Sequence, residues 1–162
     1  MARLILSDGT IFSGKPFGAP HSGAGEVVFN TGMVGYPESL TDPSYKGQVL
    51  VLTYPLVGNY GVPDDKKDKW GIPLNFESGK IQISGLIVSE YCEDFHHWAA
   101  KKSLGDWMKK QGIPGITGID TRALTQKLRS HGVMLGQIVQ DKHQPKKEFY
   151  DPNVENLVAE VS

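Results

Sequence analysis

An uninterrupted run of β-branched and aliphatic residues at positions 48–54 most strongly limits how this chain can fold. A run without polar alternation is typical of a strand buried on both faces, and Pro55 should end it because proline has no N–H to donate. Four other apolar runs are bounded by turn residues, at positions 3–6, 10–14, 25–31 and 81–89. An Asp-Gly turn at residues 8–9 predicts that the first two form a hairpin. Gly85, inside the last run, indicates a bulge or a close backbone approach.

The C-terminal half adds two predicted helices. The spacing of Ser103 and Asp106 is typical of a capping box, and Asp120 is placed to cap a second helix over residues 121–131. Short apolar runs suited to strands lie at positions 115–119 and 133–139. The sequence therefore predicts a mixed α/β domain with a β-rich core and a few helices in its C-terminal half.

Composition excludes several classes of protein. Among 162 residues, 17 Lys and Arg balance 18 Asp and Glu, which argues against a nucleic-acid partner because such proteins usually carry a basic surface. No apolar run approaches the roughly 18 residues that a membrane helix needs, and the N-terminus lacks the apolar stretch of a signal peptide. A single cysteine excludes an internal disulfide. We therefore expect a cytoplasmic protein in a reducing compartment, with no membrane partner.

One cluster of residues raises the question of catalysis. Cys92 is followed by Asp94, His96 and His97. No glycine elbow surrounds the cysteine, and acidic neighbours raise the pKa of a thiol, so a structural cysteine at a strand end is favoured. The spacing also lacks the paired halves of a zinc site, and no metal is expected. A self-contained Cys/His hydrolase or metal enzyme is the alternative function.

Polar and aromatic residues alternate with turn formers over residues 30–60. Hydrogen-bonding groups come from Thr41, Ser44 and Asn59. Flat surface comes from three tyrosines, Tyr36, Tyr45 and Tyr60. This mixture is typical of loops that present a recognition surface, but composition alone favours tight turns that link strands. No catalytic set is complete, so the residues alone predict a binding or interaction domain.

Several motifs in a fixed order carry a resemblance to a known family. They are Gly-Glu-Val-Val-Phe-Asn-Thr-Gly-Met-Val-Gly-Tyr-Pro-Glu at 25–38, Leu-Thr-Asp-Pro-Ser-Tyr at 40–45, Leu-Thr-Tyr-Pro at 52–55, Gly-Asn-Tyr-Gly at 58–61 and Gly-Ile-Asp-Thr-Arg at 118–122. Together they resemble the N-terminal domain of the small, glutamine-using subunit or region of carbamoyl-phosphate synthetase. The resemblance spans residues 1–162 and is closest to the multifunctional pyrimidine-pathway enzymes of eukaryotes.

The resemblance implies a swivelling β/β/α fold and a role in a larger enzyme. The parent enzyme makes carbamoyl phosphate from glutamine, bicarbonate and ATP, for pyrimidine or arginine biosynthesis. Its amidotransferase and ATP-grasp domains are absent from this sequence, so the chain alone should lack glutaminase and synthetase activity. The implied partners are the amidotransferase domain and the synthetase region. No cofactor is expected in this domain, while the parent uses ATP and Mg.

The resemblance also assigns one binding residue. The serine of the family's Thr-Asp-Pro-Ser-Tyr motif contacts glutamine at the boundary with the amidotransferase domain, and here it is Ser44. A hydroxyl suits this role because it both donates and accepts. The alternative is a turn residue without further function. The ammonia-dependent branch of the family tends to carry alanine at this position, so the serine favours glutamine use.

Overall fold

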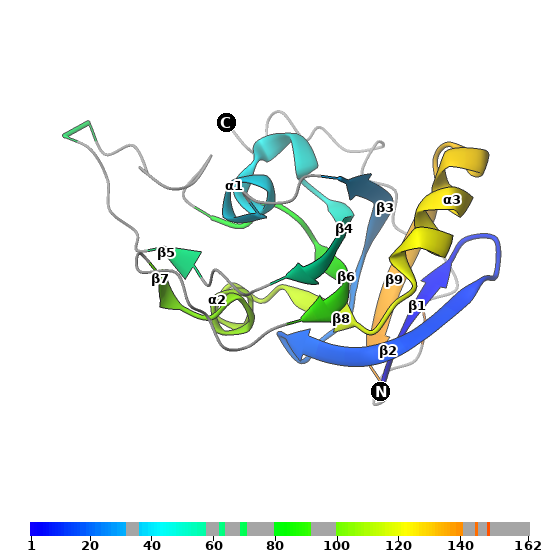
Figure 1. Ribbon diagram of the computed structural model, residues 1–162, viewed down its shortest axis with the longest axis horizontal. Helices are drawn as coiled ribbons and strands as arrows, with labels where there is room; N and C mark the ends of the chain where they lie inside the picture. The colour runs from blue at the N-terminus through cyan, green and yellow to red at the C-terminus, as the bar shows by residue number, and fades with distance from the viewer. Residues whose placement is uncertain are drawn as a thin grey trace.

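A computed structural model of the chain (Figure 1) describes residues 1–31, 36–57, 62–63, 69–70, 80–91, 100–140, 145 and 149. In these parts of the chain, seven strands form a closed barrel in the order β1-β2-β8-β6-β4-β3-β9. They are β1 (Ala2–Leu6), β2 (Ile11–Gly18), β3 (Gly23–Asn30), β4 (Gln48–Val57), β6 (Gly85–Tyr91), β8 (Pro114–Thr117) and β9 (Leu135–Gln140). Strands β5 (Val62–Pro63) and β7 (Ala100–Lys102) pair in a separate sheet. The predicted mixed α/β class with a β-rich core is confirmed.

The barrel mixes two kinds of strand pairing. Strands β3, β4, β6 and β8 run parallel to their neighbours in that series. Antiparallel pairs join β1 to β2 and β9, β2 to β8, and β3 to β9. The β1–β2 hairpin is the one that the Asp-Gly turn predicts. The amino-terminal ends of the four parallel strands therefore lie along one rim of the barrel.

Two hydrophobic cores explain why the run at residues 48–54 has no polar alternation. Val49 and Val51 of β4 belong to a core shared with β1, β3, β9 and the helix α3 (Thr121–His131). Leu50 and Leu52 belong to a second core shared with β6 and the helices α1 (Tyr36–Thr41) and α2 (Leu104–Lys110). Because successive side chains of a strand point to opposite faces, a strand with a core on each side must be apolar throughout.

The two predicted helices form with the predicted caps. The hydroxyl of Ser103 accepts a hydrogen bond from the N–H of Asp106 at 3.1 Å, and the carboxylate of Asp120 accepts one from the N–H of Ala123 at 3.0 Å. Figure 1 shows α3 beside β1, β3 and β9, with α1 and α2 lying away from it. No helix in the described parts of the chain is long and apolar enough to cross a membrane.

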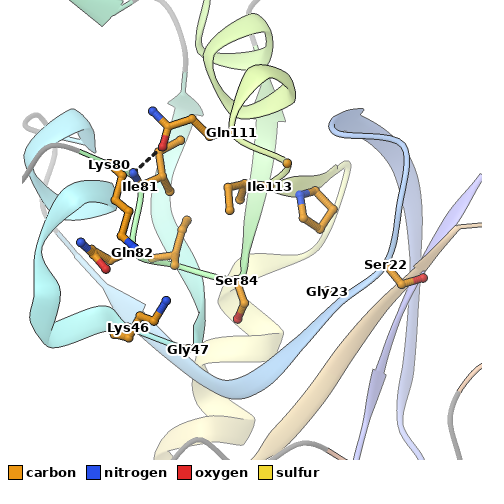
Figure 2. Close-up of a pocket in the computed structure, with 13 residues that line it drawn as sticks. Ser22, Gly23, Lys46, Gly47, Lys80, Ile81, Gln82, Ser84, Gln111 and Ile113 are labelled. Atoms are coloured by element: carbon orange, nitrogen blue, oxygen red, sulfur yellow. Dashed lines mark hydrogen bonds between the residues drawn. The ribbon is translucent and has the colours of Figure 1, made fainter. Parts of the chain in front are cut away.

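Three details differ from the sequence prediction. Strand β4 continues past Pro55 to Val57, with a register shift between Leu52 and Leu56 that accommodates a residue without an N–H. Residues 81–84 are largely buried but are not part of β6. The N–H of Ile81 bonds to the side-chain oxygen of Gln111 (Figure 2), and that of Gln82 bonds to the carbonyl of Leu40 in helix α1. The short helix α1 lies in the N-terminal half, where only strands and loops were predicted.

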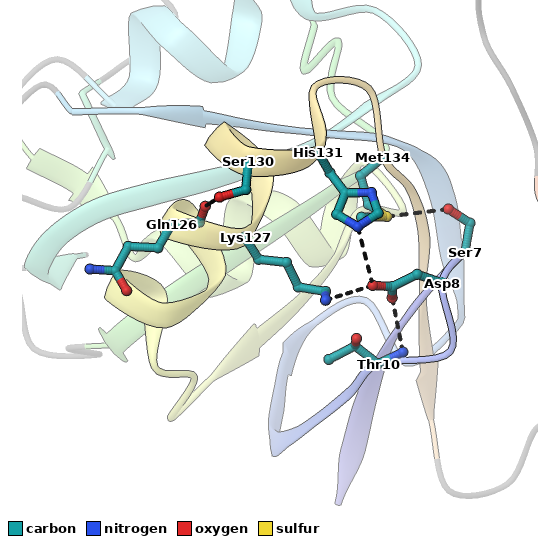
Figure 3. Close-up of polar contacts among 8 residues, drawn as sticks. All are labelled: Ser7, Asp8, Thr10, Gln126, Lys127, Ser130, His131 and Met134. Carbon is teal, nitrogen blue, oxygen red and sulfur yellow. Dashed lines mark hydrogen bonds and ion pairs between the residues drawn. The ribbon is translucent and has the colours of Figure 1, made fainter.

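An ion pair connects the turn between β1 and β2 to helix α3. Figure 3 shows the carboxylate of Asp8 between Lys127, whose ammonium lies 2.6 Å away, and the N–H of Thr10. His131 lies 4.0 Å from the same carboxylate. The hydrogen bonds from Lys127 and Thr10 hold the pKa of Asp8 well below its usual range. The C-terminal half of helix α3 is thereby tied to the turn between β1 and β2.

Candidate functional site: the turn that presents Ser44

Ser44 lies in a short 3-10 turn, η1 (Pro43–Tyr45), between α1 and β4. Asp42 begins the turn, since its carboxylate accepts a hydrogen bond from the N–H of Ser44 at 2.9 Å. The carbonyl of Asp42 also accepts from the N–H of Tyr45 at 3.0 Å, and the carbonyl of Pro43 accepts from the N–H of Lys46 at 3.1 Å. The backbone of the turn is thus closed on itself by short local bonds.

The side chain of Ser44 is exposed on this turn. In the described parts of the chain its hydroxyl makes no hydrogen bond, because the one that involves the residue comes from its backbone N–H. A hydroxyl that a rigid backbone holds in place, and that is free to donate and to accept, can form hydrogen bonds with a ligand. The geometry therefore fits the binding role that the sequence resemblance assigns to Ser44.

A side-chain network holds the turn against the barrel. The amide Nδ2 of Asn30, at the end of β3, donates to the hydroxyl of Tyr45 at 3.2 Å and to that of Ser39 at 3.3 Å. The hydroxyl of Thr53 in β4 donates to the carbonyl of Asn30 at 3.3 Å. The ring of Tyr45 also packs against the second core. Two neighbouring strands thus fix the position of the turn that carries Ser44.

Two of the residues assigned to a recognition surface face the interior instead. Thr41 is 1 % exposed, and its hydroxyl donates to the carbonyl of Pro37 at 2.8 Å within helix α1. Tyr36 is 6 % exposed and belongs to the second core. Their interpretation as surface groups was wrong, because an amphipathic helix and not an open loop occupies this stretch. Asn59 and Tyr60 lie outside the described residues.

The cluster that raised the question of catalysis lies outside the described residues as well. This applies to Cys92, Asp94, His96 and His97. Within the part of the chain that the structure describes, no three His, Cys, Asp or Glu side chains are grouped to hold a metal ion. The site at Ser44 offers a hydroxyl for hydrogen bonding on a turn that Asp42 and Tyr45 hold in place.

The described parts of the chain form a closed mixed barrel with an exposed serine turn, and comparison with known proteins identifies the family of the chain. Residues 4–138 match the family model described as carbamoyl-phosphate synthase small chain, CPSase domain. The chain therefore belongs to this family, as the ordered motifs predicted.

Named relatives match nearly the whole chain. The multifunctional protein pyr1-3 of Dictyostelium discoideum is 54 % identical over 98 % of this chain and 7 % of its own length. The mitochondrial carbamoyl-phosphate synthase [ammonia] of Homo sapiens is 51 % identical over 99 % of this chain and 11 % of its own. An arginine-specific carbamoyl phosphate synthase small chain from Eremothecium gossypii is 49 % identical over 99 % of this chain and 41 % of its own. The chain thus spans less than half of each relative, and the predicted similarity to multifunctional eukaryotic proteins is confirmed.

Sequence reasoning did not find the residues that hold the turn. Asn30 and Tyr45 lie in the motifs that carry the resemblance, but nothing in their spacing shows that one donates a hydrogen bond to the other. The pairing depends on the path of the connection between the parallel strands β3 and β4, which places the side chain of Tyr45 within reach of Asn30. Only the topology supplies that information.

Proposed function

We propose that this chain is the non-catalytic assembly domain of a glutamine-dependent carbamoyl-phosphate synthetase. The parent reaction converts glutamine, bicarbonate and ATP into carbamoyl phosphate, with ATP and Mg used outside this domain. The observation that carries the glutamine role is the exposed hydroxyl of Ser44 on a turn fixed by Asp42 and Tyr45. Membership of the small-chain family supplies the context in which such a hydroxyl faces glutamine.

The proposed contribution of Ser44 is one hydrogen bond to the amino-acid end of glutamine. The hydroxyl can donate to the α-carboxylate or accept from the α-ammonium group. A hydrogen bond to a charged group contributes about 1.5–3 kcal/mol, so its loss should weaken glutamine use roughly tenfold to a hundredfold. The glutaminase chemistry itself belongs to the amidotransferase domain, which brings its own nucleophile.

The second proposed role is to hold the amidotransferase domain against the synthetase region. A docking domain must offer apolar side chains to its partners, and the exposed large ones here include Ile11, Trp70 and Val133, each more than half exposed. The pathway we propose is pyrimidine or arginine biosynthesis, since multifunctional and arginine-specific proteins are both relatives. We propose the cytoplasm as the location of this role, since a single cysteine suits a reducing compartment.

Substitution of Ser44 in the parent enzyme tests the proposal. Ser44→Ala should raise the KM for glutamine or lower kcat/KM at least about tenfold while synthesis driven by ammonia stays near its original rate. Ser130→Ala, which removes an exposed hydroxyl from helix α3, is the matched control and should change neither activity. Equal loss of the glutamine- and ammonia-driven activities would contradict the role proposed for Ser44.

A further inference from the structure

A cavity of about 440 Å³ lies where helix α2 packs beside the barrel strands β2 and β8. The described residues that line it are residues 15–18 of β2, Tyr91 at the end of β6, Thr117 at the end of β8, and Gly105, Asp106 and Lys109 of α2. Its volume lies in the range typical of small-molecule sites, about 300–1,000 Å³. The cavity shares no residue with the turn that carries Ser44.

One face of β2 supplies both an aromatic and a charged side chain to this cavity. Lys15 and Phe17 are two residues apart in the strand, so they lie on the same face of the sheet. The register with β8 places Lys15 opposite Thr117 and Phe17 opposite Gly115. Phe17 packs against the second core, whereas Lys15 is exposed. The cavity therefore joins an aromatic wall, continuous with the core, to a charged rim.

The aromatic wall is a stacked pair of rings. The ring centroids of Phe17 and Tyr91 are 4.3 Å apart, with 12° between the ring planes. A Cβ atom added at Gly115 would lie 2.6 Å from the Cζ of Phe17, so a glycine is needed for the phenylalanine ring to lie over β8. The hydroxyl of Tyr91 accepts a hydrogen bond from the N–H of Gly105 at 2.8 Å, which joins the tyrosine ring to α2. Both rings are partly exposed, and a fixed aromatic surface suits a flat ligand.

The charged rim consists of three exposed side chains, Lys15 of β2 and Asp106 and Lys109 of α2. Within the described residues, none of the three side chains makes a hydrogen bond or an ion pair, since Asp106 is bonded to Ser103 through its backbone N–H. The two lysines come from opposite walls, so both ammonium groups can bind one phosphate or carboxylate group. The carboxylate of Asp106 can only accept hydrogen bonds, which favours a ligand with an N–H donor.

These features together restrict the ligand. An inorganic anion would make no use of the aromatic wall and would be repelled by Asp106. A neutral ring would leave both lysines without an anionic partner. An organic anion with a flat ring and an N–H donor is complementary to the wall, the lysines and the carboxylate at once.

We propose that this cavity binds a small organic anion built on a flat ring that carries an N–H donor. The phosphate or carboxylate group lies between Lys15 and Lys109, the ring packs against the stacked aromatic pair, and the N–H donates to Asp106. The site goes beyond the proposed glutamine role and does not depend on it, since it uses neither Ser44 nor an amidotransferase domain. Phosphate and carboxylate share the chemistry that the lysines recognise, and the experiment separates them.

Titration of the 162-residue chain, followed by amide chemical shifts, tests the site. The probes are adenosine monophosphate and indole-3-acetate, which both carry a flat ring and an N–H donor but differ in the anionic group. At least one of them should shift the amide signals of Lys15, Phe17 and residues 105–109, and the tighter binder identifies the anionic group. Adenosine, which lacks the anion, and inorganic phosphate, which lacks the ring, should bind at least about tenfold more weakly than that probe.

Substitutions separate the two kinds of charged group. Lys15→Gln combined with Lys109→Gln should weaken binding of the tighter probe at least about tenfold. The matched control is Lys110→Gln, which removes an exposed lysine of the same helix that is not among the described lining residues, and it should leave the affinity unchanged.

The role of Asp106 is tested with N-methylated probes that have lost the N–H donor, N6,N6-dimethyladenosine monophosphate or 1-methylindole-3-acetate. Methylation should weaken binding to the unaltered chain about threefold or more. It should make no difference to Asp106→Ala, which lacks the acceptor. An equal effect of methylation on both chains would contradict the proposed contact.

Other outcomes would overturn the proposal as a whole. They are small shifts spread over the surface lysines, unchanged affinity in the doubly substituted chain, and inorganic phosphate that binds as tightly as either probe. A short polyglutamate peptide that binds the cavity much more tightly than both probes would assign the surface to an acidic protein segment instead. If the double variant loses its dispersed spectrum, Lys15→Arg with Lys109→Arg replaces it. Retained binding then supports the site, and lost binding contradicts it.

Discussion

Removal of one hydroxyl at Tyr45 tests how the turn of Ser44 is held. Tyr45→Phe deletes the acceptor of the 3.2 Å hydrogen bond from Asn30 but keeps the ring, which packs against the second core. The amide of Asn30 keeps its bond to Ser39, while the N–H that bonds to Tyr45 loses this acceptor. A hydrogen bond at the long end of the usual range contributes about 1 kcal/mol, which corresponds to a fall in Tm of roughly 2–4 °C for a domain of this size.

The assay combines urea unfolding with amide hydrogen exchange. The N–H groups of Tyr45 and Lys46, which bond to Asp42 and Pro43, should exchange about fivefold faster in Tyr45→Phe, because the turn has lost one attachment to the barrel. Tyr91→Phe is the matched control: it also removes a phenolic acceptor, here of the N–H of Gly105 at 2.8 Å, but lies outside the turn. It should cost a similar free energy of unfolding and leave exchange in the turn unchanged. Unaltered stability and exchange in Tyr45→Phe would refute the reasoning.

Three further predictions concern the cores and the β1–β2 turn. Leu50→Ala, at a side chain with no exposed surface, should lower the free energy of unfolding by about 2–5 kcal/mol in urea titration, and a smaller loss would mean that the second core closes over the gap. Gly85→Ala places a Cβ 2.8 Å from the Cδ1 of Ile138 and should lower the free energy of unfolding by about 1–3 kcal/mol in the same assay. Ile138→Val removes that methyl group, so the double variant should recover much of the loss. If the effects of the two substitutions simply add, the contact is contradicted. The folded-state pKa of Asp8 lies below its unfolded value of about 3.9, so the pair of Asp8 with Lys127 stabilises the fold fully above that pH and loses this effect as the pH falls. Asp8→Asn should therefore make the free energy of unfolding fall less steeply between neutral and acidic pH. An unchanged pH dependence would show that the pair contributes nothing to stability.

The sequence predicted local features well where one short segment determines them. The caps at Ser103 and Asp120 form as expected, because each depends on a side chain and an N–H three residues apart. The uniform apolar run of β4 predicted burial on both faces, and the alternation of Val49 and Leu50 between two cores explains it. These features depend on periodicity alone, which is visible in any sequence.

Long-range pairing could not be predicted in the same way. Closure of the barrel joins β1 to β9, which are more than a hundred residues apart, and no local pattern records which strands become neighbours. The passage of β4 through Pro55 depends on a register shift against β6. Helix α1 was missed because six residues with a proline near the start give too short a periodic pattern.

The site at Ser44 combines information from the sequence with information from the structure. Ser44 came from a resemblance of motifs, and the structure shows its exposure and the bonds that position it.

The central claim is that this chain supports glutamine use without performing it. Glutamine hydrolysis should be measured for the 162-residue chain alone and after mixing with a separately produced amidotransferase domain. The account predicts no hydrolysis by the chain alone and, on mixing, a complex with higher glutaminase activity than the amidotransferase domain has by itself. Turnover by the chain alone would contradict the account and return attention to Cys92.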